Sequence, residues 1–190
     1  MAKPDKKEYP EFYQTYINAL EVDDTLLNHL ESSLKYFEEV LLDIALSKQE
    51  YRYAEGKWTI KEIVQHLIDT ERVFIYRALR YSRKDSGSLL SFDENSFVTN
   101  YQINKRNFDD MLNEFTLLRR STIFMFQDFD EEIMGRQSWS VKYFRQGNRV
   151  YLQRTRNAPF KGYQRAIYYE LTPYGLILNI ARLLLIRCKF

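Results

Sequence analysis

Apolar residues recur every three or four positions along three stretches of the chain, and this spacing predicts three long amphipathic helices. The first is predicted over residues 23–46, the second over residues 59–81 and the third over residues 103–126. A short helical arm is expected before the first helix. Because strand signals are few and three such helices need a fourth to close their core, the predicted fold class is all-α, an up-and-down four-helix bundle.

The start of the second helix has the clearest boundary signal in the chain. Thr59 is followed three positions later by Glu62. This is the spacing of a capping box, in which each side chain accepts a hydrogen bond from the backbone amide of the other residue. Such a cap contributes about 1 kcal/mol, so the helix is predicted to begin at Thr59.

The segment that should provide the fourth helix is unfavourable for helix formation. It contains Pro159 and Gly162, which cost roughly 3 and 1 kcal/mol in a helix interior. We therefore expect the fourth helix to be degraded. The chain divides into a bundle of the first three helices, residues 1–137, and an atypical basic and apolar segment, residues 138–190.

Charge is distributed unevenly between these two parts. Residues 138–190 contain ten of the 28 basic residues and one of the 26 acidic residues, although the whole chain has a net charge of only +2. Arginines interleaved with aromatic residues are typical of single-stranded nucleic-acid binding. The alternative is that this composition results from translation in a shifted reading frame. We favour the alternative, and nucleic acid is not an expected partner.

Other features of the composition indicate a cytoplasmic protein. A single cysteine, Cys188, excludes an internal disulfide framework and fits a reducing compartment. The first residues carry positive charge with no apolar run behind them, unlike a signal peptide. The most apolar stretch, residues 175–186, is too short to span a membrane.

Candidate chemistry depends on two histidines, His29 and His66. His29 is expected to be solvated, whereas His66 lies at the edge of the apolar face of the second helix. Asp69 and Glu71 could form a catalytic carboxylate pair, but residues two positions apart on a helix point in different directions. Glu71 falls near the apolar face, so it is expected to pair with an arginine.

The sequence around His66 resembles the DinB/YfiT-like four-helix bundle superfamily, and the likeness covers residues from about 9 to 137. The matching stretches are 53–62 (YAEGKWTIKE), 66–72 (HLIDTER), 76–80 (YRALR), 92–95 (FDEN) and 112–119. The resemblance implies one metal ion, often zinc or nickel, bound by three histidines. His66 matches the ligand on the second helix. The other two belong to a Gly-His-x-x-His-His segment on the last helix.

No histidine follows His66 in this chain, so the implied metal site is incomplete. Permitted codons for residues 154–160 (RTRNAPF), read one base later, can encode Gly-His-Glu-Met-His-His. We therefore predict a frameshift near residues 137–140, with residues 138–190 as its out-of-frame product.

Two functions remain open on these grounds. The resemblance implies a metal-dependent enzyme, a thiol-dependent transferase or a hydrolase, acting on a small molecule. Its divalent metal would be bound through His66, and no catalytic residue is identified. The alternative is a metal-free, non-catalytic bundle that acts through binding or dimerisation, because an isolated histidine is most often an inert polar residue. A homodimer is expected in either case.

Overall fold

The structure is a computed structural model that describes residues 26–42, 44–52, 54–85, 87, 89, 92–134, 141–146 and 149–154. Its elements follow one another along the chain as α2 (Leu26–Leu41), η3 (Leu46–Lys48), α3 (Ile60–Ser82), α4 (Glu94–Asn100), η4 (Ile103–Lys105), α5 (Phe108–Gln127), α6 (Glu131–Met134), β1 (Val141–Gln146) and β2 (Arg149–Arg154). The expected arm before residue 23 lies outside the described residues. Of the segment expected to provide the fourth helix, residues 141–146 and 149–154 are described and form strands, and residues 155–190 lie outside the described residues.

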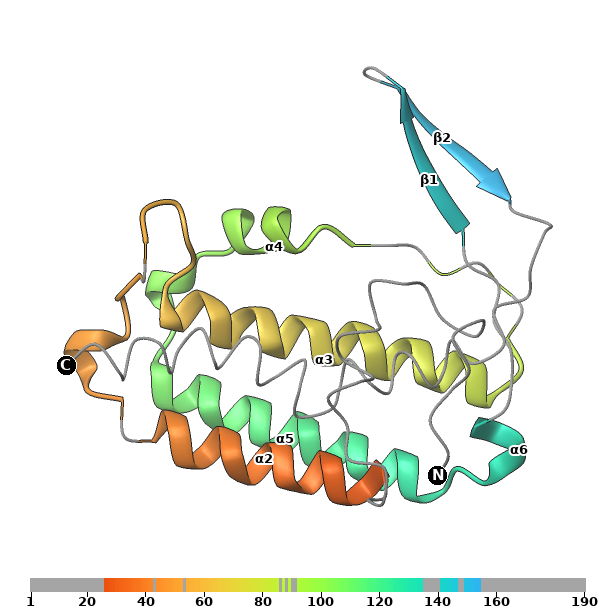
Figure 1. Ribbon diagram of the computed structural model, residues 1–190, viewed down its shortest axis with the longest axis horizontal. Helices are drawn as coiled ribbons and strands as arrows, with labels where there is room; N and C mark the ends of the chain where they lie inside the picture. The colour runs from red at the N-terminus through yellow and green to blue at the C-terminus, as the bar shows by residue number, and fades with distance from the viewer. Residues whose placement is uncertain are drawn as a thin grey trace.

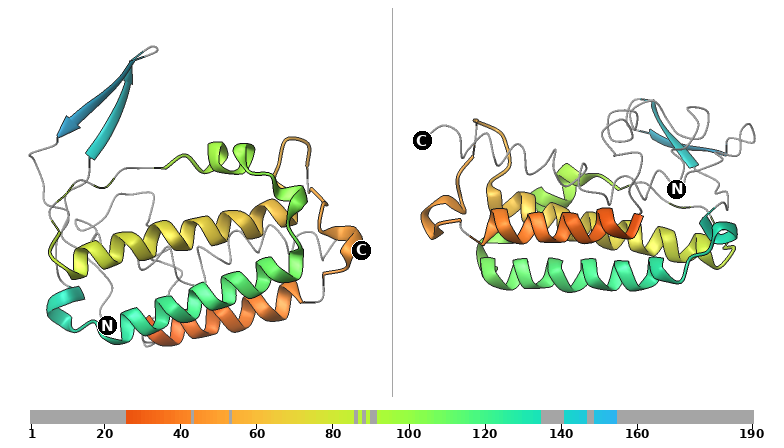
Figure 2. Two further views of the ribbon diagram at one scale, coloured as in Figure 1. Left: turned by 180° about the vertical axis from the view of Figure 1, so that it is seen from behind. Right: turned by 60° about the horizontal axis from the view of Figure 1, so that its bottom comes forward.

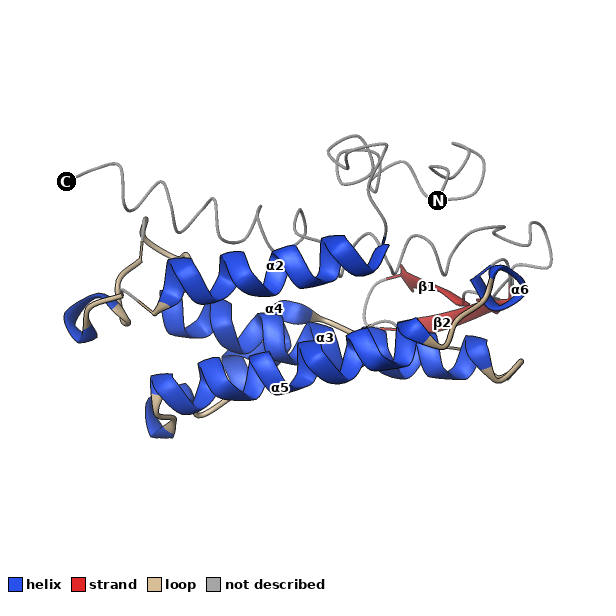
Figure 3. Cartoon of the chain, turned by 90° about the horizontal axis from the view of Figure 1, so that it is seen from below, coloured by secondary structure: helices blue, strands red, loops and turns tan. Residues whose placement is uncertain are grey.

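Three long helices, α2, α3 and α5, lie side by side and form the body of the molecule (Figures 1 and 3). They correspond to the three helices predicted from the apolar spacing. The prediction for α3 differs from the observed helix by one residue at each end. The other two predicted helices were too long, because α2 ends at Leu41 and residues 103–105 form a separate 3-10 turn before Asn107 caps α5.

The direction of the helices departs from a simple up-and-down order. Glu38 near the end of α2 accepts a hydrogen bond from Thr116 of α5, whereas Glu31 lines a cleft with Gln127 at the end of α5, so α2 and α5 are antiparallel. By contrast, α3 and α5 run in the same direction, as the colour gradient in Figure 2 shows. The chain must therefore return along the bundle between them, and α4 lies in this return segment.

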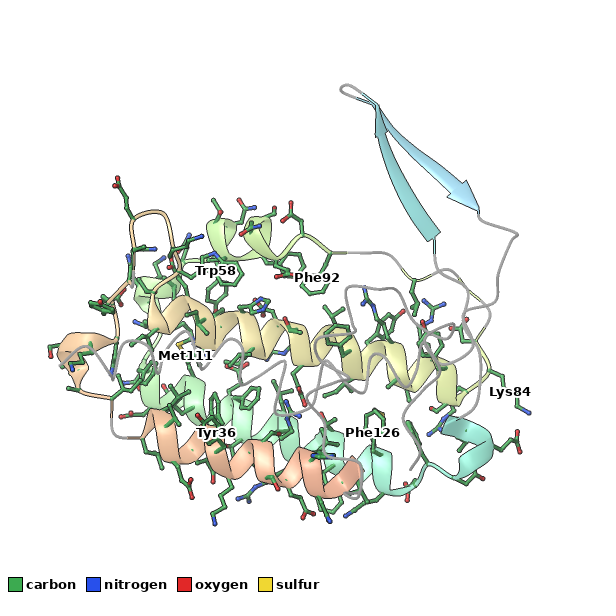
Figure 4. The ribbon with its side chains drawn as sticks, viewed as in Figure 1. Tyr36, Trp58, Lys84, Phe92, Met111 and Phe126 are labelled. Carbon is green, nitrogen blue, oxygen red and sulfur yellow. The ribbon has the colours of Figure 1, made fainter. Side chains whose placement is uncertain are left out.

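The core lies between these three helices. Phe37 of α2 and Phe115 of α5 are both fully buried, with ring centroids 4.2 Å apart. Met111, also fully buried, projects from α5 towards α3 (Figure 4). The core residues are Phe37, Val40, Leu41, Ile60, Ile63, Val64, Leu67, Ile68, Ile103, Phe108, Met111, Leu112 and Phe115.

A buried ion pair links α3 to α5. Arg119 Nη2 lies 3.0 Å from Glu71 Oε2, and the two side chains are 2% and 1% exposed. The Thr122 hydroxyl donates a second hydrogen bond to Glu71, over 2.5 Å. Burial raises the pKa of the Glu71 carboxyl, against the opposing effects of Arg119 and Thr122. The predicted pairing of Glu71 with an arginine is confirmed.

The segment after residue 140 contains two paired antiparallel strands, β1 and β2, which we did not predict. Their register runs from Val141 opposite Arg154 to Gln146 opposite Arg149. The sequence does contain a signal for this pairing, because the Gly147-Asn148 pair separates two runs that each contain valine and tyrosine. Among the described residues, no helix is both long and apolar enough to cross a membrane.

The capping box of α3 gives a first prediction. The Thr59 hydroxyl accepts from the Glu62 amide over 3.0 Å, and the Thr59 amide donates to the Glu62 carboxylate over 2.7 Å. We expect Thr59→Ala to lower the free energy of unfolding by about 1 kcal/mol in urea denaturation. Thr99→Ala, at an exposed position in α4, should change it by less than about 0.5 kcal/mol. Equal effects of the two substitutions would contradict the capping role.

The buried ion pair gives a second prediction. Glu71→Gln preserves volume but leaves the Arg119 charge buried without its carboxylate, so it should cost about 3–5 kcal/mol of stability. The double variant Glu71→Gln, Arg119→Met removes that charge and should be less destabilised than Glu71→Gln alone. Chemical denaturation of the wild type, the two single variants Glu71→Gln and Arg119→Met, and the double variant measures these differences. Additive costs would mean that the two side chains are not coupled.

Candidate functional site

The N-terminal half of α3 is buried on most of its sides, including positions occupied by polar residues. Lys61, Gln65 and His66 are 7%, 2% and 7% exposed. A surface helix normally presents such residues to solvent, so their burial shows that α3 is covered by neighbours around most of its circumference. His66 faces the side on which α4 crosses.

The turn before α3 holds an aromatic ring against His66. Arg52 pairs with Thr59 in an isolated β-bridge, and its guanidinium donates to the Lys57 carbonyl over 2.6 Å and to the Glu62 carboxylate over 2.9 Å. These contacts fix the backbone on both sides of Trp58. The indole of Trp58 then lies with its ring centroid 4.8 Å from that of His66, tilted by 45°.

His66 lies in a seam between α3 and α4, and α4 forms the side of this seam opposite α3. Its first turn is fixed by Asp93, whose side chain accepts from the Ser96 amide over 3.1 Å. This places the Glu94 carboxylate near the imidazole, with 4.0 Å between Glu94 Oε2 and His66 Nε2. Figure 4 shows Trp58 and Phe92 in the layer between α3 and α4.

The other imidazole nitrogen of His66 faces its own helix. His66 Nδ1 lies 3.4 Å from the hydroxyl of Thr70, one turn further along α3. An imidazole nitrogen and a carboxylate oxygen are both ligands for divalent transition metals. A protein metal site normally needs three or four ligands, however, and the described residues contain no group of three histidine, cysteine or acidic residues that could hold a metal. They therefore do not fit a complete metal centre.

The remaining predicted site residues lie apart from His66. His29 is on α2 and belongs to no possible ligand group among the described residues. Asp69 accepts a hydrogen bond from Gln65 over 2.9 Å, and burial raises the pKa of its carboxyl. Since Glu71 instead pairs with Arg119, the expectation that Asp69 and Glu71 point in different directions is confirmed.

Sequence reasoning missed two polar features of the structure. The first is the position of Glu94 beside His66, because the two residues are 28 positions apart and no local pattern links them. The second is Glu114, which contacts both Arg72 and Arg106. Burial raises the pKa of Glu114, but the two arginines outweigh this effect and lower it. This cluster lines an open surface cleft of about 480 Å³ between α3 and α5.

Comparison with solved structures supports the bundle assignment. YfiT from Bacillus subtilis, described as a probable metal-dependent hydrolase with an unusual four-helix bundle topology, matches with a TM-score of 0.64. The match covers 95% of this chain and 90% of YfiT at 13% sequence identity. Identity this low shows the fold alone, and it confirms the predicted class, an all-α four-helix bundle.

Family comparison extends the resemblance along the chain. A comparison with curated proteins found no match. The model of the DinB superfamily matches residues 29–177, which include His66, Glu94 and part of the segment after residue 137. The boundary at residue 138 and the frameshift stay predictions. With more than three quarters of its length matched, the chain belongs to the DinB superfamily.

Proposed function

We propose that this chain is the scaffold of a divalent-metal-dependent enzyme, of the hydrolase or thiol-dependent transferase type, in which His66 is one metal ligand. The observation that carries the proposal is the setting of His66. Its imidazole is buried in the α3–α4 seam and directs Nε2 towards a carboxylate rather than into the apolar core. The description of YfiT as a probable metal-dependent hydrolase supports the same reaction class.

The contacts of His66 suit a ligand better than an inert seam residue. Metal-binding histidines generally have the second ring nitrogen engaged by a neighbour, which fixes the tautomer and the ring orientation. Thr70 can fulfil this role at Nδ1, and Trp58 restricts the ring from one side. The metal is expected to be zinc or nickel, and the substrate a small molecule.

The sequence after residue 137 limits what this polypeptide can do. With His29 on another helix and no histidine beyond His66, a three-histidine centre cannot form within one chain. We therefore infer that the chain as printed has lost stoichiometric metal binding and the activity that depends on it. The segment encoded one base out of frame would restore the two missing imidazoles.

A non-catalytic bundle that acts as a homodimer is the second candidate. The observation favouring it is on α5, where Leu117 and Phe124 are 59% and 70% exposed. They are seven residues apart and so lie on the same face of the helix. Clefts of about 480 and 420 Å³ lie on the two sides of this face. The apolar ridge of one copy could pack against that of a second copy.

Metal analysis of purified protein tests the first proposal. We expect the printed chain to contain well below one zinc or nickel ion per chain. A version with the restored reading frame, carrying Gly-His-Glu-Met-His-His, should contain about one, because three imidazoles then meet the usual ligand number. His66→Ala in the restored version should abolish binding. Full metal occupancy that persists after His66→Ala would refute the role of His66.

The dimer is tested by sedimentation velocity at about 0.1 mM protein, where a dissociation constant in the micromolar range gives mainly dimer. Phe124→Glu places a charge on the apolar ridge and should shift the protein to monomer. Leu42→Glu is the matched control, because Leu42 is 71% exposed and follows the end of α2. A wild-type protein that sediments as a monomer would exclude this candidate.

A further inference from the structure

His66 is enclosed from two sides, and the two walls differ in how firmly they are held. On one side lies the indole of Trp58, with 4.8 Å between the ring centroids. The backbone around Trp58 is fixed by hydrogen bonds from Arg52 to the Lys57 carbonyl and the Glu62 carboxylate. On the other side lies α4, on the face of α3 turned away from α2 and α5 (Figures 1 and 2). Because Nε2 of His66 is directed at this second wall, a reagent that approaches Nε2 meets α4 first.

Few contacts attach α4 to the bundle. Of the seven residues of α4, all of them described, only Val98 is buried, whereas α5 buries eight of its twenty. Phe97 on the same helix is 45% exposed. The contact between Glu94 and His66 spans 4.0 Å, longer than a hydrogen bond, and the Glu94 side chain is 55% exposed. A half-exposed contact of this kind contributes little to stability, so α4 is held mainly by the burial of Val98.

The chain on the C-terminal side of α4 is fastened to the core. Arg106 donates to the Tyr101 hydroxyl over 3.2 Å and also pairs with Glu114 of α5. Ile103, between Tyr101 and Arg106, is 9% exposed and belongs to the core. Residues 101–106 are therefore an anchor, called here the η4 anchor, about which α4 can turn.

The N-terminal side of α4 is held more weakly. The Phe92 ring packs against Phe97 of α4, with 5.4 Å between the centroids. The guanidinium of Arg77 on α3 lies 5.8 Å from the Phe92 centroid, near the limit of about 6 Å for a cation–π contact. Phe92 and Phe97 move together because they contact each other within one short segment. Residues 92–100 are thus one unit, firmly fastened at one end and weakly held at the other.

We propose that residues 92–100 form a lid over His66, which opens about the η4 anchor while α2, α3 and α5 stay packed. Segments with few buried apolar side chains open locally at a small fraction of the free energy of global unfolding. Opening breaks the contact of Phe92 with Arg77 and exposes Val98. The importance of the lid for catalysis rests on the proposed function, because the lid then admits the substrate to His66 and excludes water once closed. The motion itself does not depend on a bound metal.

Diethyl pyrocarbonate, which acylates neutral imidazole, tests the lid on the printed chain. The chain has only two histidines, so peptide mass spectrometry follows the rates of His66 and His29 separately. The rates are measured at urea concentrations below the unfolding transition. Opening of the lid exposes little surface, so the His66 rate should change by less than about twofold per molar urea. Global unfolding would raise it by about fivefold or more per molar.

A matched pair of variants tests which residue holds the lid. Val98→Ala removes two buried methyl groups, and it should raise the His66 rate about tenfold. Thr99→Ala, at the exposed neighbouring position, should change this rate by less than about twofold. His29 lies on α2 and should react at the same rate in all three proteins. Circular dichroism shows that the variants are folded.

Three results would overturn the lid. The first is a wild-type His66 rate that rises with urea as steeply as global unfolding. The second is a rate that Val98→Ala leaves unchanged. The third is a His66 that stays unmodified while His29 reacts fully, since the lid then does not open.

The proposed function is tested separately by the metal content of the restored chain. A restored chain without metal refutes the proposed function and leaves the motion of the lid standing. A steep urea dependence of the His66 rate refutes the lid and leaves the proposed function standing.

Discussion

The buried ion pair between Glu71 and Arg119 is the constraint on which the arrangement of the helices depends. Both side chains lie almost wholly out of water between α3 and α5. Because a buried charge without its partner costs several kcal/mol, α3 and α5 cannot slide by one turn without a large loss of stability. Apolar contacts alone would tolerate such a shift more easily, since they are not directional. The pair therefore fixes the register in which the apolar core around Phe115 is packed.

The parallel course of α3 and α5 has a direct consequence for the candidate site. A chain that runs in the same direction twice must return in between, and this return segment carries α4 across the side of α3 on which His66 lies. The Glu94 carboxylate reaches the imidazole only because of this crossing. In a simple up-and-down connection, a short loop would replace the segment. The polar seam is thus a product of the connectivity of the bundle.

The proposal of a metal-dependent enzyme draws on membership of the DinB superfamily and on the contacts of His66. The chain, however, has only two histidines, too few for a three-histidine metal centre. The helices α2, α3 and α5 pack around one core, and α3 holds the imidazole of His66 buried beside Glu94 of α4. The segment after residue 137 contains no histidine, and its described residues form two paired strands, β1 and β2. The scaffold and the chemistry are therefore separable, as expected when function resides in a site carried by a fold.

The sequence by itself determined the features that depend on neighbouring residues. Helix periodicity, the cap at Thr59 and the need of Glu71 for a partner follow from local hydrogen bonding and from the cost of burying a charge. Only the tertiary structure decided which arginine meets Glu71, that α3 and α5 are parallel, and that Glu94 faces His66. These contacts join residues 28 or more positions apart, and their formation depends on how whole helices pack. No local pattern of residues encodes that packing.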